Sequence, residues 1–248
     1  MAGVRILILD IETRPALVYS WGMHNQTFGP AQVVEWGGML CFAAKWHGSP
    51  DMQFHAEWKG RDRMIRAAHR LLNEADAVVG WNSARFDVRW MQAEFQRAGL
   101  ARTSPYANVD LMRSQKRDAF MLSNKLESRR LWLGEEGKAE TGGFGLWRAV
   151  LAGDKEARRQ MEEYNRRDVL ITEEEFDRMR AGGWVRGLPN HAIDGGHVCP
   201  SCGGGKLQAR GFAHSKTRRY RRYQCKSCGA WSQAAKSEPG GAKVKGIA

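Results

Sequence analysis

The first 180 positions contain apolar residues in two kinds of pattern, short continuous runs and helically spaced repeats. The short runs predict β-strands at residues 4–10, 38–47, 51–57, 77–80 and 109–112. The helical repeats predict α-helices at residues 61–75, 86–98, 123–133, 146–152 and 154–180. Ser123 is expected to be the N-cap of the third helix. The pattern therefore predicts a domain that contains both strands and helices.

Glycine and proline mark where this domain ends. Gly182-Gly183 breaks the last predicted helix, so the first domain is expected to span residues 1–183. Residues 184–196, which include Pro189, predict a linker, and a small second module is expected at residues 197–235. Residues 236–248 contain Pro, Gly and Lys without a core pattern, which predicts a disordered basic tail. Residues 134–147 are expected to be irregular.

Three short motifs place acidic residues at the ends of predicted elements. Asp10 and Glu12 close the first strand, where the alternation of side chains points both to the same face. Asp87 follows a later strand, and Tyr164 and Asp168 share one face of the last helix because they are four residues apart. Hard divalent cations prefer oxygen ligands. The four carboxylates and the phenol therefore predict a site for Mg²⁺ or Mn²⁺.

An alternative reading is that these acids are helix caps and solvated loop charges. For any one motif taken alone, that reading explains the acidic residues as well as a metal site does, because Asp-x-Glu occurs by chance in many chains. The ordered set of three motifs, each in the expected strand or helix context, favours the metal site.

The same three motifs resemble the DEDD exonuclease superfamily, and the tyrosine indicates its tyrosine-type branch. The resemblance covers residues 4 to 180 and rests on Asp10-x-Glu12, on Asn82-x-x-x-Phe86-Asp87 and on Tyr164-x-x-x-Asp168. It implies an α/β ribonuclease-H-like fold, with a mixed β-sheet flanked by helices. It also implies two Mg²⁺ or Mn²⁺ ions and the release of nucleoside 5′-monophosphates from 3′ ends. Trp21-Gly22 and residues 40–46 are similar to a phage and bacterial subgroup.

The resemblance implies a role for each residue of the motifs. Asp10 corresponds to the carboxylate that bridges both metals. Glu12 and Asp168 complete the site of the metal that activates water, and Asp87 supports the second metal. Tyr164 orients the attacking water.

Other aromatic and polar residues are candidates for contact with the substrate. Trp21 and His24 lie in the loop after Asp-x-Glu, where they are candidates for stacking on the terminal base. Asn82 and Phe86 of the second motif are candidates for nucleic-acid contact. The competing reading is that the tryptophans are core residues, since large aromatic side chains dominate apolar burial.

The second module contains two Cys-x-x-Cys pairs separated by a hairpin-length segment. Cys199, Cys202, Cys225 and Cys228 together predict a site for one structural Zn²⁺, which makes the module a small zinc ribbon. Two disulfides are the first alternative, but the chain shows no secretory signal. A thioredoxin-like redox motif is the second, but it needs a single pair at the start of a helix. Cys41 is interpreted as a small buried apolar residue.

Positive charge is concentrated in the second module. The chain has 39 Lys and Arg against 27 Asp and Glu, and from Gly195 onward we count 11 basic residues against Glu238 alone. Between the cysteine pairs, tyrosines alternate with the cations Lys216, Arg218, Arg219, Arg221 and Arg222. Cations neutralise phosphates and aromatic rings stack on bases, so this segment predicts nucleic-acid binding. Alternatively, the tyrosines form the ribbon core, or the ribbon binds a polymerase or another replication protein.

The sequence thus predicts a metal-dependent 3′–5′ exonuclease acting on single-stranded 3′ ends, with DNA favoured although no motif reads the 2′-hydroxyl. The alternative is a nucleic-acid-binding zinc-ribbon adapter with an inactive nuclease fold. The four acidic residues argue against it, because an inactive fold has no physical reason to keep four converging, mutually repelling carboxylates. No apolar run reaches the roughly 20 residues of a membrane helix. We therefore expect no membrane contact and a cytoplasmic location in a bacterial or phage-infected host cell, without secretion.

Overall fold

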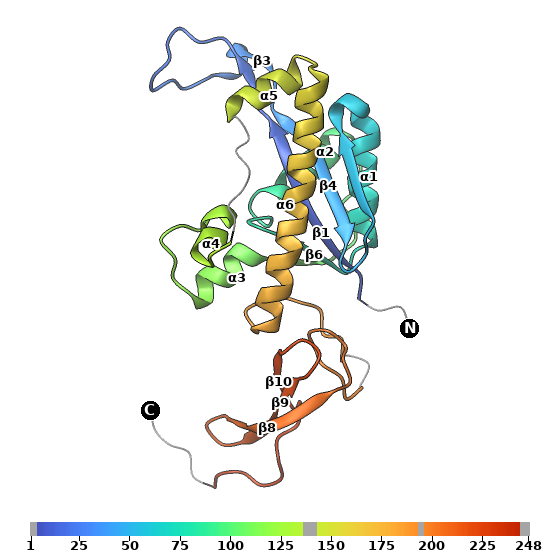
Figure 1. Ribbon diagram of the computed structural model, residues 1–248, viewed down its shortest axis with the longest axis vertical. Coiled ribbons are helices and arrows are strands. Elements are labelled where there is room, and N and C mark those ends of the chain that lie inside the picture. Colours follow the sequence, from blue (N-terminus) through green and yellow to red (C-terminus); the bar gives the residue numbers. More distant parts are fainter. Residues whose placement is uncertain (1–3, 136–142, 193–195, 244–248) are drawn as a thin grey trace. The chain divides into compact units, whose positions relative to one another are not determined.

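The computed structural model describes residues 4–135, 143–192 and 196–243 (Figure 1). The chain divides into two compact units, an N-terminal unit of Arg5–Glu174 and a C-terminal unit that begins at Glu175. The predicted irregular segment 134–147, the predicted linker and the predicted tail each lie partly outside the described residues. The predicted domain boundaries at 183 and 197 fall within the C-terminal unit and stay predictions. No helix in the described ranges is long and apolar enough to cross a membrane.

A mixed five-stranded sheet, with strand order β5-β4-β1-β6-β7, forms the centre of the N-terminal unit. Its strands are β1 (Ile6–Arg14), β4 (Gly38–Trp46), β5 (Met52–Ala56), β6 (Ala77–Gly80) and β7 (Ala107–Asp110). β4 pairs antiparallel with β1 and β5, whereas β6 pairs parallel with β1 and β7. This arrangement confirms the predicted mixed sheet.

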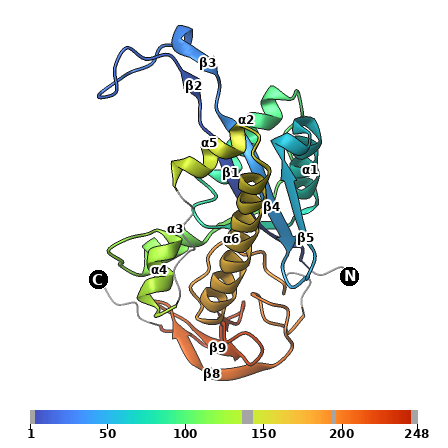
Figure 2. The same ribbon diagram turned by 45° about the horizontal axis from the view of Figure 1, so that its top comes forward.

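Helices cover both faces of the sheet (Figures 1 and 2). One face packs against α1 (Arg61–Glu74) and α2 (Asp87–Arg97), and Leu7, Leu9 and Ile11 of β1 belong to this core. The other face packs against α5 (Phe144–Leu151) and α6 (Lys155–Ala181). Because side chains alternate along β1, Asp10 and Glu12 must point to the α6 face.

Two predictions for the segment after β6 are wrong. The predicted strand at 109–112 ends instead at Asp110, because the side chain of Asp110 accepts the backbone N–H of Arg113 and caps helix α3 (Leu111–Asp118). Helix α4 (Leu126–Trp132) begins after Lys125, so Ser123 is not its N-cap. The Ser123 hydroxyl instead accepts the N–H of Lys125 at 3.4 Å, in the turn that precedes the helix.

An extension that the sequence pattern did not predict follows β1. Residues 15–37, here called the arm, contain the short antiparallel pair β2 (Leu17–Val18) and β3 (Val33–Glu35) and the 3₁₀ turn η1 (Pro30–Gln32). Figures 1 and 2 both show the arm extending away from the end of β1. The arm has exposed aromatic side chains at Tyr19, Trp21 and Trp36.

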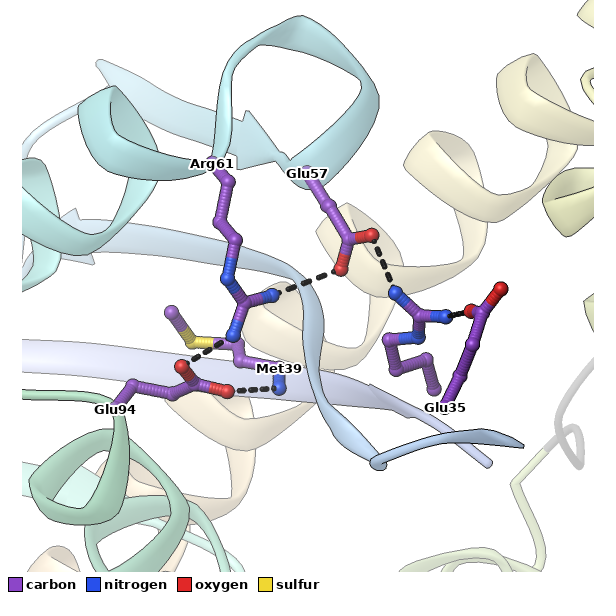
Figure 3. A network of polar contacts seen from close by, with 6 residues as sticks. Glu35, Met39, Glu57, Arg61 and Glu94 are labelled. Carbon is purple, nitrogen blue, oxygen red and sulfur yellow. Dashed lines mark hydrogen bonds and ion pairs between the residues drawn. The ribbon is translucent and has the colours of Figure 1, made fainter. Parts of the chain in front are cut away.

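A chain of ion pairs holds the base of the arm (Figure 3). Arg14 of β1 pairs with Glu35 of β3 and donates to Glu57 in the turn η2 (Glu57–Lys59) at 2.8 Å. Arg61 then joins Glu57 to the buried Glu94, which accepts the backbone N–H of Met39 at 3.0 Å. These contacts connect the arm, the start of β4 and helices α1 and α2.

The C-terminal unit contains a three-stranded antiparallel sheet of β8 (Leu207–His214), β9 (Arg219–Cys225) and β10 (Trp231–Gln233), in the order β10-β9-β8. The prediction of a disordered tail from residue 236 needs correction for residues 238–242. The N–H groups of Glu238 and Ala242 donate to the carbonyls of Arg219 and Thr217, so this segment lies along the hairpin. The last residues of the predicted tail, 244–248, are outside the described ranges.

Candidate metal centres

Three carboxylates from two elements converge on the α6 face of the sheet. Oxygen atoms of Asp10 and Glu12 on β1 and of Asp168 on α6 all lie within 4.8 Å of one another. Asp168 is buried, and the other two are half-buried. Such a donor set fits a hard divalent cation, because oxygen ligands satisfy the cation and the cation cancels the repulsion between the carboxylates. The structure thus brings together three of the four predicted carboxylates.

Tyr164 lies in the same cleft and is held by an aromatic neighbour. The cleft has a volume of about 510 Å³, and its lining includes Asp10, Tyr164 and Asp168. The ring of Trp147 on α5 meets the Tyr164 ring edge-on, with centroids 6.5 Å apart, and its Nε1 donates to the carbonyl of Thr13 at 3.0 Å. Trp147 therefore positions Tyr164 relative to β1, a role that sequence reasoning did not detect.

Asn165 is a second residue that sequence reasoning missed. Its side-chain amide donates to the Asp10 carboxylate at 2.7 Å and to the Asp10 carbonyl at 3.2 Å. The residue is completely buried, and its Oδ1 has no hydrogen-bond partner among the described residues. The only sequence signal for this role is that a polar residue follows Tyr164 on the face of α6 that packs against the sheet. Asn165 fixes both the backbone and the carboxylate of Asp10.

Asp87 is not part of the carboxylate cluster. It is buried at the start of α2, and its Oδ1 accepts the backbone N–H of Ile11, between Asp10 and Glu12, at 3.1 Å. Burial, together with the nearby carboxylate of Asp110, raises the pKa of Asp87 to about 7, although backbone hydrogen bonds lower it in part. The structure thus gives Asp87 a contact with the metal-site strand, and its predicted role at a second metal stays a prediction.

The loop before α2 is shaped by Asp110. Its carboxylate accepts the backbone N–H groups of Asn82 at 3.2 Å and Ala84 at 3.3 Å. Asn82 adopts a left-handed backbone with φ of 64°, and a Cβ on Gly80 would lie 2.7 Å from the Cβ of Ser83. Because of this tight loop, Asn82 lines the cleft, whereas Phe86 is partly exposed and is not among the residues that line it.

Trp21 and His24 do not line the cleft. Both lie on the arm, and the Trp21 side chain is fully exposed. The competing interpretation of Trp21 as a core residue is wrong. Cys41, in contrast, is buried opposite Glu12, and burial together with the carboxylates of Glu12 and Asp10 raises the pKa of its thiol. This agrees with the interpretation of Cys41 as a small apolar residue.

The four cysteines of the C-terminal unit form the second candidate metal centre. Their sulfur atoms all lie within 4.8 Å of one another, and the Cys199–Cys228 and Cys202–Cys225 pairs are each 3.7 Å apart. Sulfurs that ligate a tetrahedral zinc at about 2.3 Å are about 3.8 Å from each other. The observed spacing therefore fits zinc, and it is far longer than the ~2 Å of a disulfide bond.

The two cysteine pairs have the same backbone structure. Cys199 and Cys225 each accept, through the carbonyl, an N–H from the glycine four residues later, and each donates to the carbonyl five residues later. Both glycines, Gly203 and Gly229, have a left-handed φ near 72° and 73°. These turns gather the thiols, and the N–H of Ser227 donates to the Cys225 sulfur at 3.3 Å.

The basic residues of the ribbon follow β9 and the turn before it. Lys216, Arg218, Arg219 and Arg222 are exposed, and Arg221 is half-buried beside Glu238 at 3.4 Å. Arg219 and Arg221 lie over the ring of Phe212, at 4.6 and 4.2 Å from its centroid. The tyrosines are half-buried, which agrees better with the ribbon-core reading than with free stacking surfaces.

Replacing Asn165 should weaken metal binding without unfolding the protein. We expect Asn165→Ala to lower the affinity for Mn²⁺ by about 10- to 100-fold, because outer-shell partners orient the ligands they contact. Isothermal titration calorimetry measures the affinity. Asn73→Ala is the matched control. The Asn73 side chain, on helix α1, donates to the carbonyl of His69 and accepts the backbone N–H of Ser104, instead of contacting Asp10. Unchanged Mn²⁺ affinity in Asn165→Ala would contradict the positioning role.

The ribbon should lose zinc when one thiol is replaced. We expect Cys225→Ser to contain no stoichiometric zinc and to lose the β8–β9–β10 sheet, while the N-terminal unit still melts cooperatively because its core is separate. Atomic absorption gives the zinc content, and X-ray absorption should show about four sulfurs at about 2.3 Å in the wild type. Cys41→Ser is the control and should retain zinc. Full zinc occupancy in Cys225→Ser would contradict the site.

Comparisons with known proteins agree with this fold. The family model of the RNase H superfamily matches residues 45–179, which is more than half of the 248 residues and begins after Asp10 and Glu12. No match was found among curated proteins. A similar solved structure is the family B DNA polymerase from the hyperthermophilic archaeon Pyrobaculum calidifontis, with a TM-score of 0.51 and 16% identity. The match covers 90% of this chain and 33% of the polymerase chain, so this chain spans about a third of the polymerase's length. The chain belongs to the RNase H superfamily.

Proposed function

We propose that the protein is a metal-dependent 3′–5′ exonuclease of the tyrosine-type DEDD branch. Its substrate is a single-stranded 3′ end, with DNA favoured, and its product is a nucleoside 5′-monophosphate. The observation that carries the proposal is the convergence of Asp10, Glu12 and Asp168, of which Asp10 and Asp168 line one cleft with Tyr164. Membership in the RNase H superfamily supports a nuclease.

The residues of the cleft have separate tasks in this proposal. Asp10, Glu12 and Asp168 hold two Mg²⁺ or Mn²⁺ ions, with Asp87 supporting the second. When bound, the ions lower the pKa of water and stabilise the leaving oxygen. Tyr164 orients the attacking water through its hydroxyl, because Trp147 fixes the position of the ring. Asn165 holds Asp10 in place throughout.

The chain's zinc ribbon is proposed to bind the substrate strand. The support is the row of exposed cations Lys216, Arg218 and Arg222 on a module with little acidic charge. Binding to a polymerase or another replication protein is the competing proposal for the ribbon. Four thiols spaced for zinc are consistent with a reducing compartment. We therefore propose a cytoplasmic location, in a bacterium or a phage-infected host cell as the resemblance implies.

The catalytic proposal predicts different effects for two substitutions. Asp168→Ala should abolish Mg²⁺-dependent hydrolysis of a 3′-labelled single-stranded oligonucleotide, because the metal cluster loses a ligand. Tyr164→Phe should lower kcat by about 100-fold with a nearly unchanged KM, since the hydroxyl acts mainly in the transition state. Tyr106→Phe, a substitution between α2 and β7, is the control and should leave both constants unchanged. A fully active Asp168→Ala protein would exclude the assignment and favour the inactive-fold adapter.

The ribbon proposal predicts a change in salt dependence. The double substitution Lys216→Gln/Arg218→Gln should lower the slope of log affinity against log salt by about 1.4, or about 0.7 per lost phosphate contact on a single strand. Fluorescence anisotropy with a labelled 20-nucleotide strand in Ca²⁺ measures the slope. Lys206→Gln/Lys226→Gln, beside the cysteine pairs, is a matched charge control. An unchanged slope in the first variant would leave protein binding as the better role for the ribbon.

A further inference from the structure

The helical segment that follows β7 exposes large apolar side chains, and part of this segment lines the cleft. This α3–α4 segment, Leu111–Leu133, contains α3, α4 and the turn that joins them. Phe120, Leu122 and Trp132 are 91%, 101% and 72% exposed. Exposed large apolar side chains on a segment that lines a cleft are candidates for contact with a ligand. None of these residues belongs to a sequence motif.

The same segment carries an excess of positive charge. Residues 111–135 contain six Lys and Arg against three Asp and Glu. Arg113, Lys116, Arg117 and Lys125 are exposed, and none forms an ion pair with another described residue. The arginines of α6 behave differently, because several of them pair with a carboxylate on their own helix, as Arg159 does with Glu163. The four cations of the α3–α4 segment therefore remain available for an anionic ligand.

The segment forms one wall of the cleft that contains the carboxylates. Met112 and residues 124–127 line this cleft together with Asp10 and Asp168. The Nε1 of Trp81 donates to the carbonyl of Asn124 at 2.9 Å, which ties the turn to the end of β6. The wall is therefore continuous with the metal cluster.

Buried polar contacts make the two helices a single unit. The side chain of Gln115 on α3 is buried and contacts both Met121 in the turn and Arg129 on α4. Arg130 of α4 in turn pairs with Glu174 of α6 at 2.9 Å. The exposed aromatic and cationic side chains are thus presented from a surface with a defined position relative to the cleft.

We propose that the α3–α4 segment binds the single-stranded part of the substrate that leads into the cleft. The cations contact phosphates, and Phe120 and Trp132 stack on bases. Cations alone would serve a duplex equally well, but exposed rings need unpaired bases, so the combination selects a single strand. A protein partner would not require four unpaired cations around the apolar residues. The proposal rests on the exonuclease function and adds the binding surface for the strand.

Two sets of variants test the proposal through binding and turnover. Lys116→Gln/Arg117→Gln removes two cations, and Trp132→Ala removes a ring, whereas Trp132→Phe keeps a stacking surface. Arg66→Gln/Arg97→Gln makes the same charge change on α1 and α2, at the other face of the sheet, and is the control. All substituted side chains are exposed, so melting curves should be unchanged. Binding is measured by anisotropy with a labelled 20-nucleotide DNA strand and with the matching duplex, in Ca²⁺.

Single-strand affinity is expected to fall about tenfold in Trp132→Ala and to stay within about threefold in Trp132→Phe. The double cation variant should lower the salt slope by about 1.4. Turnover is compared on the same oligonucleotide and on thymidine 5′-monophosphate p-nitrophenyl ester, a substrate too small to reach Phe120 and Trp132 together. The ratio of kcat/KM for the oligonucleotide to that for the ester should fall about tenfold in Trp132→Ala and in the cation variant.

The outcomes separate this proposal from the exonuclease function. If the wild type hydrolyses neither substrate with Mn²⁺, the exonuclease function is wrong, and the binding measurements still decide the role of the segment. If the wild type hydrolyses both, but Trp132→Ala and the cation variant match the Arg66→Gln/Arg97→Gln control in affinity, slope and ratio, the α3–α4 proposal is wrong. Equal losses for single strand and duplex would also overturn it, because stacking would then play no part.

Discussion

Three carboxylates within 4.8 Å of one another impose the main constraint on this fold. At that separation, two charged groups repel by about 3 kcal/mol with an effective dielectric constant of 20. A chain that places them together must hold each one against this repulsion until a cation binds. The structure meets the constraint by placing Asp10 and Glu12 on a central strand and Asp168 on a long helix packed across it.

A neutral amide and a backbone hydrogen bond help to hold Asp10 and the strand that carries it. Asn165 binds the carboxylate and the carbonyl of Asp10, and Asp87 binds the N–H of the next residue, Ile11. Asp110 holds the loop that leads to Asp87, through the N–H groups of Asn82 and Ala84. These contacts fix positions without cancelling the negative charge, so the site stays attractive to a cation. The exposed cations of the α3–α4 segment are proposed to contact the substrate and not the metal ligands.

The two candidate metal centres differ in how much the fold around them depends on a bound metal. The carboxylate cluster lies on a sheet whose core is already closed by α1, α2, α5 and α6, so the N-terminal unit does not depend on metal for its fold. The described part of the zinc ribbon has a small buried cluster, in which Cys199 and Cys225 join Ala230. A metal bound by the four thiols would therefore supply much of the folding free energy there. The difference follows from the number of apolar residues that each unit can bury.

The sequence by itself determined the elements and most of the chemistry. Apolar runs and helical repeats predict the sheet and its helices, since burial on one face has a fixed period, and strand alternation alone places Asp10 and Glu12 together. The cysteine spacing predicts the four-thiolate cluster because both pairs lie within local turns. The strand prediction failed at Asp110, which ends β7 and starts α3, because its side chain caps the helix by accepting the N–H of Arg113 and the apolar pattern does not record that cap. Only the tertiary structure showed that Asn165 holds Asp10 and that Asp87 contacts strand β1. Each depends on residues far apart in sequence, and no local period records such contacts.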